Sequence, residues 1–317
     1  MRVTVTGGAG YIGACATREL LAAGHDVTVL DSLLHGQEDV AAGLEAAGAH
    51  VVRGDVRDAA ARREALDGAE GVVHLAAIVG DPACAADPER SHEVNVEGTR
   101  ALVADAAGAE RIVFASTCSN YGRMADPLVP VDETAPLAPV SLYAEQKVQM
   151  ERELLARDGV ATCLRFATIY GVAERMRFDL TVNEFTRDLW DGRTLEVYGE
   201  QFWRPYVHVA DAARALALVL AAPADRVAGR VFNVGHSDEN YRKLDLVGVI
   251  RERLPAADVR FVHRDEDPRD YRVSFERIRT ELGFDPVMRV PDGVAELLVG
   301  LEEHRFGDPF DRRFSNV

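Results

Sequence analysis

Hydrophobic and polar positions alternate along the first half of the chain in a rhythm that predicts strands and helices in turn. Val3 and Val5 stand between polar residues, as in a short strand, and residues 11–23 then read as a helix that stops at Gly24. Further strands are expected at 26–30, 71–77, 111–116 and 160–166, and a further helix at 89–108. Strands that alternate with helices are typical of a parallel, doubly wound sheet, so the pattern predicts an α/β fold.

The rhythm becomes irregular after about Gly171. Residues 206–221 and 230–234 still look like a core helix and a core strand, whereas the segments around them hold most of the later Arg, Asp and Pro residues. We therefore predict a large sheet domain and a smaller C-terminal α/β lobe. The predicted boundaries are 1–171 plus 206–236 for the domain, and 172–205 plus 237–317 for the lobe.

Three glycines follow the first predicted strand at the spacing G-x-x-G-x-x-G. Gly7 permits a tight turn, Gly10 lets the backbone approach a pyrophosphate, and Gly13 lets the next helix pack closely on the strand. Asp31 ends the second strand, where a carboxylate can accept hydrogen bonds from the ribose hydroxyls of NAD and would repel the extra phosphate of NADP. This order predicts a Rossmann-type NAD site; a glycine-rich turn without a ligand is the alternative.

Tyr143 and Lys147 stand four residues apart, which places them on one face of a helix. An ammonium beside a phenol favours the phenolate, so we expect Lys147 to lower the pKa of Tyr143 from about 10 toward neutrality. Such a phenol can move a proton to or from an alcohol or sugar oxygen. Many helices contain a Tyr and a Lys at this spacing by chance. The glycine run at the N-terminus is what supports a catalytic interpretation of the pair.

Composition narrows the cellular setting of the protein. The 317 residues carry a net charge of −16, which argues against nucleic-acid partners and anionic membrane surfaces. No apolar run approaches the roughly 20 residues of a membrane span, and no signal peptide precedes the first predicted strand. The cysteines show neither paired nor metal-ligand spacing, and the histidines are scattered. We therefore expect a cytoplasmic protein with no metal, no membrane and no nucleic acid among its partners.

Together these residues resemble an extended short-chain dehydrogenase/reductase of the NAD-dependent epimerase/dehydratase family, which acts on nucleotide sugars. The resemblance covers nearly the whole chain. It rests on residues 6–13, Asp31, and residues 54–56, 74–77, 95–99, 116–117, 121–122, 143–147 and 204–211. In combination these motifs are highly specific.

The resemblance implies roles for individual residues. The pyrophosphate of the cofactor would lie beside Gly7, Gly10, Tyr11, Ile12 and Gly13, and the adenosine ribose at Asp31. Adenine would lie at Asp55 and Val56, and the path toward nicotinamide would be lined by Leu75, Ala76 and Ala77. The remaining predicted cofactor contacts are Asn95, Tyr143 and Lys147. Thr117 takes the position of the catalytic Ser or Thr, and Tyr143 is the proton shuttle. Arg204 and Arg269 resemble arginines that grip the sugar-nucleotide diphosphate. Residues 175–185, with Asn183 as the predicted contact, would lie beside the sugar.

The resemblance also implies a homodimer built on the helix of Tyr143 and Lys147. Val148, Leu154 and Leu155 fit a dimer face of that helix and equally fit the core of one chain. The last residues carry three phenylalanines among charges, Phe306, Phe310 and Phe314. We expect them to pack as a C-terminal arm, and docking on a partner subunit is the alternative.

Two departures from the family pattern bear on the reaction. The dehydratases follow the catalytic Thr with an acid pair, whereas this chain has Cys118 and Ser119, and Thr168 replaces an Asn that many relatives carry. The elimination base is therefore missing, and the leading interpretation is a nucleotide-sugar epimerase acting at C4 through NAD. Alternatives are an NAD(P)H-dependent 4-ketoreductase, a dehydratase with Cys118 as acid, and a non-catalytic dinucleotide-sensing module.

Overall fold

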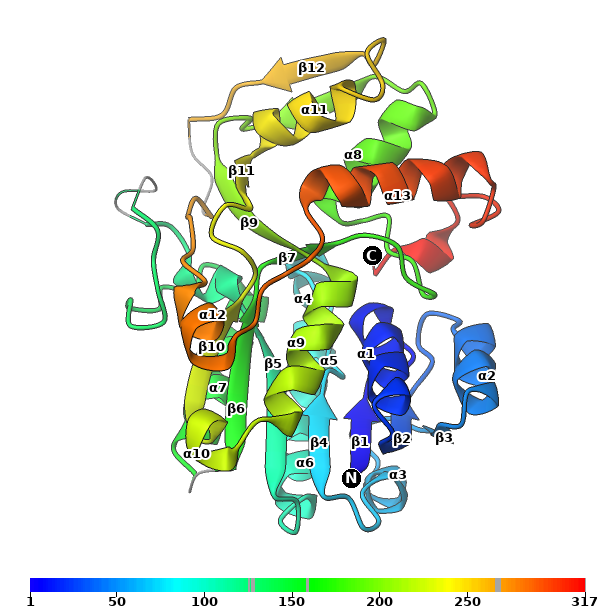
Figure 1. The fold of residues 1–317 in the computed structure, drawn as a ribbon, viewed down its shortest axis with the longest axis vertical. Coiled ribbons are helices and arrows are strands. Elements are labelled where there is room, and N and C mark those ends of the chain that lie inside the picture. Colours follow the sequence, from blue (N-terminus) through cyan, green and yellow to red (C-terminus); the bar gives the residue numbers. More distant parts are fainter. Residues whose placement is uncertain (125, 127–128, 158–159, 266–268, 317) are drawn as a thin grey trace.

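The computed structural model describes residues 1–316 except 125, 127–128, 158–159 and 266–268. Its lower part in Figure 1 is a seven-stranded parallel sheet with the order β10-β6-β5-β4-β1-β2-β3. The strands are β1 (Arg2–Thr6), β2 (Asp26–Asp31), β3 (His50–Arg53), β4 (Gly71–His74), β5 (Arg111–Thr117), β6 (Ala161–Phe166) and β10 (Arg230–Val234). This confirms the predicted doubly wound α/β fold.

Helices cover both faces of this sheet. On the face seen in Figure 1, α1 packs beside α9, and α12 lies against β10; α3, α6 and α7 cover the opposite face. The helices of this part are α1 (Tyr11–Ala22), α2 (Glu38–Ala46), α3 (Ala59–Ala65), α4 (Asp81–Ala86), α5 (Pro88–His92), α6 (Thr99–Asp105), α7 (Leu142–Leu155), α9 (Val209–Ala221), α10 (Ala224–Val227) and α12 (Glu276–Leu282), with a π-helix η1 (Glu93–Gly98) and a 3₁₀ helix η2 (Cys118–Tyr121).

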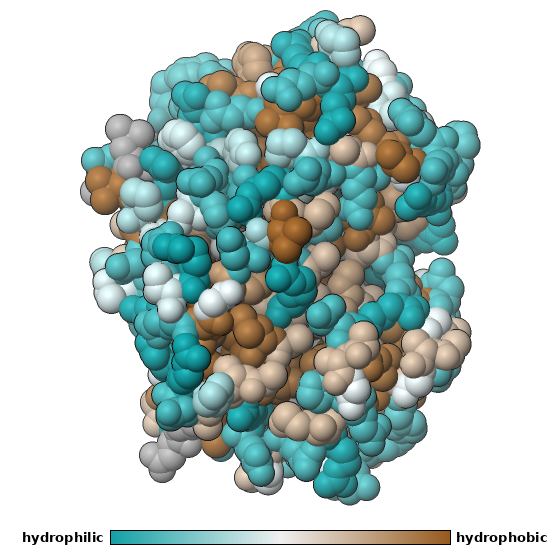
Figure 2. Space-filling view, in the orientation of Figure 1, coloured by the Kyte–Doolittle hydropathy of each residue, from teal (hydrophilic) through white to brown (hydrophobic). Residues whose placement is uncertain are grey.

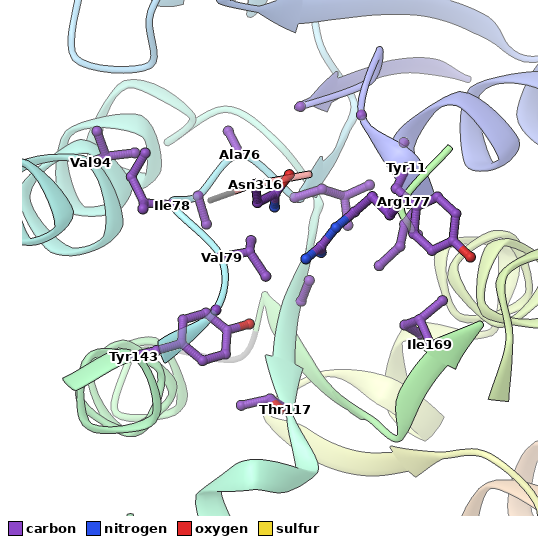
Figure 3. Close-up of a pocket in the computed structure, with 18 of the residues that line it drawn as sticks. Tyr11, Ala76, Ile78, Val79, Val94, Thr117, Tyr143, Ile169, Arg177 and Asn316 are labelled. Carbon is purple, nitrogen blue, oxygen red and sulfur yellow. The ribbon is translucent and has the colours of Figure 1, made fainter. Parts of the chain in front are cut away.

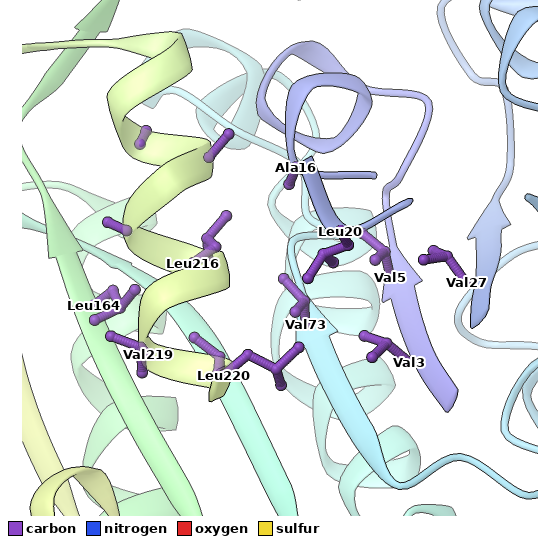
Figure 4. Close-up of a cluster of buried hydrophobic side chains, with 14 of the residues drawn as sticks. Val3, Val5, Ala16, Leu20, Val27, Val73, Leu164, Leu216, Val219 and Leu220 are labelled. Carbon is purple, nitrogen blue, oxygen red and sulfur yellow. The ribbon is translucent and has the colours of Figure 1, made fainter. Parts of the chain in front are cut away.

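Successive residues of a strand point to opposite faces, so each central strand feeds two cores. Val73 joins the core beneath α1 and α9, whereas its neighbour Val72 joins the core beneath α6 and α7. In the first of these cores, shown in Figure 4, Leu216 and Leu220 of α9 lie beside Leu20 of α1 over the sheet. Continuous apolar strands with two covered faces are the expected outcome for a parallel sheet.

A smaller lobe lies above the carboxyl ends of the sheet strands (Figure 1). Its three-stranded sheet has the order β11-β9-β7, a two-stranded sheet pairs β12 with β8, and α8, α11 and α13 pack around them. The elements are β7 (Thr168–Tyr170), α8 (Thr181–Trp190), β8 (Leu195–Tyr198), β9 (Trp203–His208), β11 (Asn240–Arg242), α11 (Lys243–Arg251), β12 (Val259–Val262), α13 (Val290–Glu302) and a 3₁₀ helix η3 (Arg312–Phe314). Figure 2 shows that this face of the molecule is largely hydrophilic, with a hydrophobic region in its lower half.

Phe306 and Phe314 are buried in the lobe core against Phe178, which confirms the expected packing of the C-terminal arm. Phe310 lies under the guanidinium groups of Arg187 and Arg193. At α7, two of the predicted dimer-face residues, Val148 and Leu154, are instead buried within the chain itself.

Two local predictions differ from the structure. The predicted helix 89–108 is divided into α5, the π-helix η1 and α6, and residues 206–208 end strand β9 before α9 begins. The two-lobe boundaries stay a prediction, yet Ile278 and Phe284, which they assign to the small lobe, pack in the core of the large sheet. Long-range pairing and packing decide these points, and the local pattern does not contain them.

Close packing at the first turn gives a stability prediction. A Cβ at Gly13 would lie 2.0 Å from the carbonyl oxygen of Gly7 and 2.7 Å from Cα of Gly8. We expect Gly13→Ala to lower the free energy of unfolding by about 1–3 kcal/mol, as overpacking does. Gly248→Ala, in α11 with open space around it, is the control and should stabilise by up to about 1 kcal/mol. Urea unfolding measures both, and equal effects would contradict the packing argument.

Candidate active site

A cavity of about 330 Å³ opens where the strand order reverses between β1 and β4, below the small lobe. Parallel sheets bind ligands at this switch point because neighbouring loops diverge there. The cavity brings together most of the predicted site: Gly7, Gly10, Tyr11, Ile12, Gly13, Asp31, Asp55, Val56, Leu75, Ala76, Ala77, Thr117, Tyr143, Lys147 and Arg269. Figure 3 shows Tyr143 and Thr117 at one side of it and Tyr11 at the other.

The glycine turn gives the cavity a backbone floor. Gly7 has φ +69°, and a Cβ there would meet the amide nitrogen of Ala76 at 2.8 Å. Gly10 is the N-cap of α1 and makes no side-chain capping hydrogen bond, so the first amides of the helix have no side-chain acceptor at that position. A helix N-terminus with open amides is suited to phosphate oxygens. The turn therefore fits the pyrophosphate of a dinucleotide.

Asp31 is held at the end of β2 by two backbone donors. Its carboxylate accepts hydrogen bonds from the amides of Ala9 and Leu33, both at 2.9 Å. Burial raises the pKa of Asp31, and these two hydrogen bonds act in the opposite direction. A carboxylate oxygen can accept more than one hydrogen bond, so Asp31 keeps the capacity to accept from ribose hydroxyls in the cavity that it lines.

Asn95 supports the cavity from behind. It is 3% exposed and does not line the cavity. Its Oδ1 accepts from the amide of Ile78 at 2.8 Å, and its Nδ2 donates to the Ile78 carbonyl and to Gln146 Oε1. Asn95 therefore fixes the loop after β4, and Ile78 and Val79 of that loop form the wall near Tyr143 (Figure 3). Asn95 lies in the π-helix η1, a distortion that is frequent at functional sites.

Tyr143 is placed by the first turn of α7. The N-cap Ser141 accepts from the amide of Ala144, and its hydroxyl donates to Asp81 Oδ1 at 2.7 Å. Thr117, at the end of β5, accepts from the amide of Ser119 at 3.1 Å, which caps η2. Both hydroxyl-bearing side chains reach the same cavity, as the sequence predicted.

The electrostatics of Tyr143 differ from the prediction. Burial raises the pKa of Tyr143, and the opposing positive charge is that of Arg177 across the cavity. The Lys147 ammonium donates to the Ala115 carbonyl at 2.8 Å and lies 5.9 Å from the centre of the Tyr143 ring. Burial also lowers the pKa of Lys147 to about 8. The expected lowering of the phenol pKa by Lys147 is therefore not found, because desolvation of the phenol outweighs the nearby charge.

A buried network holds the strand that carries Thr117. Glu151 and Arg165 form an ion pair and are 1% and 4% exposed. Ser116, next to Thr117, donates to Glu151 at 2.8 Å, and Arg165 donates to the hydroxyl of Tyr121 at 2.9 Å. A fully hydrogen-bonded buried pair fixes one arrangement of its neighbours, and here it fixes the end of β5.

Cys118 does not reach the cavity. Its side chain is 1% exposed, its thiol donates to the Arg165 carbonyl at 3.2 Å, and burial raises its pKa. Ser119 lines the cavity instead. The predicted acid role of Cys118 therefore has no geometric support, because the turn after β5 directs alternate residues to opposite sides.

Two further predicted contacts also lie outside the cavity. Asn183 is fully buried: its Oδ1 accepts from the Gly171 amide, and its Nδ2 donates to Tyr11 Oη and the Arg177 carbonyl. Tyr11 Oη in turn donates to the Gly171 carbonyl at 2.6 Å. These bonds join α1 to the small lobe. Arg204 is 7% exposed, donates to the Trp203 carbonyl and lies over the Tyr271 ring.

Several lining residues were not singled out by the sequence analysis. Arg175 and Arg177 line the cavity from the segment after β7, Asp81 lines it from α4, and Asn316 lines it from the end of the chain. Asp81 pairs with Arg269 at 3.0 Å. The two arginines stand within the stretch that was expected beside the sugar, so their charge was the available signal. Asn316 gave no signal in the sequence.

The lining residues fit a dinucleotide at this site. The glycine turn and α1 suit its pyrophosphate, Asp31 suits its ribose, and Lys147 lines the same cavity. Among the residues described, no group of three or more His, Cys, Asp or Glu side chains could hold a metal ion. The described helices include none that is long and apolar enough to cross a membrane.

The shifted pKa of Lys147 predicts a pH dependence of stability. Between pH 8 and 10.5 the unfolded chain binds more protons than the folded chain, so the free energy of unfolding should rise with pH, by up to about 3 kcal/mol. Lys147→Met should remove this rise. Lys243, the other lysine of the chain, lies outside the cavity, and Lys243→Met is the control. Urea unfolding at pH 7–10 measures the difference; parallel curves for wild type and Lys147→Met would contradict it.

Comparison with known proteins agrees with this site. A model of the NAD dependent epimerase/dehydratase family matches residues 3–235. The chain is 31% identical to the UDP-glucose 4-epimerase of Lacticaseibacillus casei, over 97% of this chain and 99% of that protein. It is also 31% identical to the dTDP-glucose 4,6-dehydratase of Streptomyces niveus, over 96% and 94%.

Solved structures give the same result. DesIV, the dTDP-glucose 4,6-dehydratase of Streptomyces venezuelae with NAD and TYD bound, has a TM-score of 0.86 at 32% identity and covers 98% of this chain and 100% of its own. The UDP-glucose 4-epimerase of Thermus thermophilus in complex with NAD has a TM-score of 0.83 at 28% identity, with 95% and 99% covered. Family match, fold and cavity together place the chain in the NAD-dependent epimerase/dehydratase family of extended short-chain dehydrogenases/reductases, as an enzyme that uses NAD.

Proposed function

We propose that this enzyme is a nucleotide-sugar epimerase that inverts C4 through a transient 4-keto sugar. One observation carries the proposal. Tyr143, Thr117 and Lys147 line the same cavity as the glycine turn, and the two positions that follow Thr117 hold no carboxylate. UDP-glucose 4-epimerases are among the similar proteins, which agrees with this interpretation.

The residues suggest how the reaction proceeds. The glycine turn and Asp31 would hold NAD, which would supply the acceptor and donor of the hydride at C4. Tyr143, as phenolate, takes the proton of the 4-hydroxyl, and Thr117 donates a hydrogen bond to the same oxygen. After the keto sugar turns, Tyr143 returns the proton. Ile78 and Val79 form an apolar wall beside Tyr143, and Ile169 lines the opposite side of the cavity, so few polar contacts would hold the sugar in one orientation.

A dehydratase needs a base for the C5 proton. Asp31, Asp55 and Asp81 are the carboxylates that line the described cavity. Asp31 and Asp55 belong to the adenosine side, and Asp81 is paired with Arg269 and Ser141. Neither Cys118 nor Ser119 supplies the missing base. A 4-ketoreductase, which uses the same Thr, Tyr and Lys with external NAD(P)H, is the second candidate.

The proposal extends to assembly and location. We propose a cytoplasmic homodimer, as the family resemblance implies. The four cysteines are free thiols, as expected in a reducing compartment. Since Val148 and Leu154 are buried within the chain, the dimer face of α7 would have to use its more exposed side chains. Sedimentation of the purified protein tests the oligomeric state.

Catalysis by Tyr143 is tested by substitution. Tyr143→Phe should lower kcat by about 10²–10⁴-fold, because the proton shuttle is lost while the ring still fills its place. Thr117→Val should lower kcat by about 10–100-fold, since one hydrogen bond to the reacting oxygen is removed. Cys118→Ala is the matched control, because its thiol lies outside the cavity, and its activity should stay close to that of the wild type. Full activity in Tyr143→Phe would refute the mechanism, and a large loss in Cys118→Ala would revive the dehydratase.

The reaction itself is tested with the protein and a panel of UDP-, dTDP- and GDP-hexoses. An epimerase gives a product of unchanged mass and inverted C4, with no net use of reduced cofactor. Loss of the mass of water would indicate a dehydratase, and Asp81→Asn would then test its base. Stoichiometric consumption of NADH or NADPH with a 4-keto-6-deoxy sugar nucleotide would indicate the ketoreductase.

A further inference from the structure

Arg175 is an unusual residue in the wall of the cavity. Its side chain lines the cavity, yet the residue is only 6% exposed. Its Nη2 donates to the Ser315 carbonyl at 3.3 Å, whereas its buried Nε has no hydrogen-bond partner among the residues described. No carboxylate of the described chain forms a salt bridge with it. A buried guanidinium without an anion is costly, so its retention beside a cavity points to an anionic ligand.

The segment around Arg175 is fixed against α1 and the small lobe. Glu174 pairs with Arg18 of α1, and one of its two contacts, from Arg18 Nη2, is 3.0 Å long. Arg177 pairs with Asp179 at 2.6 Å, and its guanidinium points into the cavity in Figure 3. The two arginines therefore line one cavity from a segment that is joined to α1 through Glu174.

The last described residues, 312–316, hold this wall in place, and we name them the end segment. The Phe178 amide donates to the Phe314 carbonyl at 2.8 Å, and the Asn316 amide donates to Asp179 Oδ2 at 3.2 Å. Phe314 also packs edge-on against Phe178, with ring centres 5.7 Å apart. Together with the Ser315 carbonyl on Arg175, these contacts fix the stretch that carries the two arginines.

The end segment also reaches the cavity itself. The side chain of Asn316 lines the cavity, and its Oδ1 is buried without a hydrogen-bond partner among the described residues. Both Arg175 and Asn316 thus present buried polar atoms that the described chain leaves unsatisfied. Buried polar groups are normally hydrogen-bonded, so a polar ligand beside this wall would account for both.

We propose that Arg175, positioned by the end segment, binds the pyrophosphate of NAD and completes the anion site begun by the glycine turn. Arg175 is assigned to the dinucleotide because it follows Glu174, whose ion pair with Arg18 joins this segment to α1, the helix that begins at the glycine turn. The charge of Arg175 acts on Asp31, and burial lowers the pKa of Arg175 to about 10. A bound anion would raise that pKa again. A guanidinium fork suits two phosphate oxygens. The proposal rests on NAD binding and not on the reaction at C4.

Calorimetric titration of the protein freed of dinucleotide tests this with NAD, ADP, adenosine and NADP as probes. Arg175→Met should weaken the binding of NAD and ADP by about 10–100-fold, which is the range for a lost hydrogen bond to a charged group, and should leave the affinity for adenosine unchanged. Arg175→Lys should restore part of the loss. Arg193→Met is the control, because Arg193 is an exposed arginine of the same lobe outside the cavity, and its affinities should equal those of the wild type.

Three results would overturn the proposal. NAD affinity of Arg175→Met equal to that of Arg193→Met would show that Arg175 contacts no ligand. An equal loss for adenosine, with no recovery in Arg175→Lys, would assign Arg175 a structural role. A loss confined to NADP would move the contact to a 2′-phosphate. Thermal unfolding without ligand adds a check, since replacing an unpaired buried cation by Met should leave the midpoint equal or higher.

The end segment is tested separately by Phe314→Ala, which leaves Arg175 intact but removes the anchor. We expect NAD and ADP to bind several-fold more weakly and adenosine to bind as before; unchanged NAD binding would refute the positioning role. These readouts need no turnover. A protein that binds NAD through Arg175 but converts no sugar would refute the proposed epimerase and leave this inference standing.

Discussion

The close approach of backbones at the first turn is the constraint on which the rest of the site depends. Gly7 lies against Ala76, and Gly13 lies against Gly7, at distances that leave no room for a Cβ. Because of these contacts, α1 starts directly at the end of β1, and the loop after β4 passes beside it. The cavity exists at this point because the strand order reverses between β1 and β4, so the loops after these two strands leave in opposite directions.

Burial decides the chemistry of the other half of the site. Lys147 was expected to lower the pKa of Tyr143, yet desolvation raises the pKa of Tyr143 and lowers that of Lys147. Desolvation favours the uncharged form of each group, which is the protonated phenol of Tyr143 and the neutral amine of Lys147. The positive charge of Arg177 acts in the opposite direction on Tyr143. In the proposed mechanism, bound NAD⁺ would add to this charge and favour the phenolate.

Hydrogen bonds between distant segments fix the walls of the cavity. Asn95 of η1 holds the loop of Ile78, and the pair of Glu151 and Arg165 holds the end of β5 behind Thr117. Asn183 joins α1 to the small lobe through Tyr11. Residues that looked like ligand contacts in the sequence thus serve to position the walls of the cavity. Their buried polar groups are bonded within the chain, and few donors or acceptors remain for a ligand.

The sequence by itself determined the fold class, the family, NAD as cofactor, and the placement of Tyr143, Thr117 and Asp31 in one site. These properties follow from local order: alternating patterns, glycine spacing and residues at strand ends, which a parallel sheet brings to one edge. Only the tertiary structure decided which way each side chain points. It turned Cys118, Asn183 and Arg204 away from the cavity and brought Arg175 and Asn316 into it. Burial and long-range contacts set those directions, and neither can be read from neighbours along the chain.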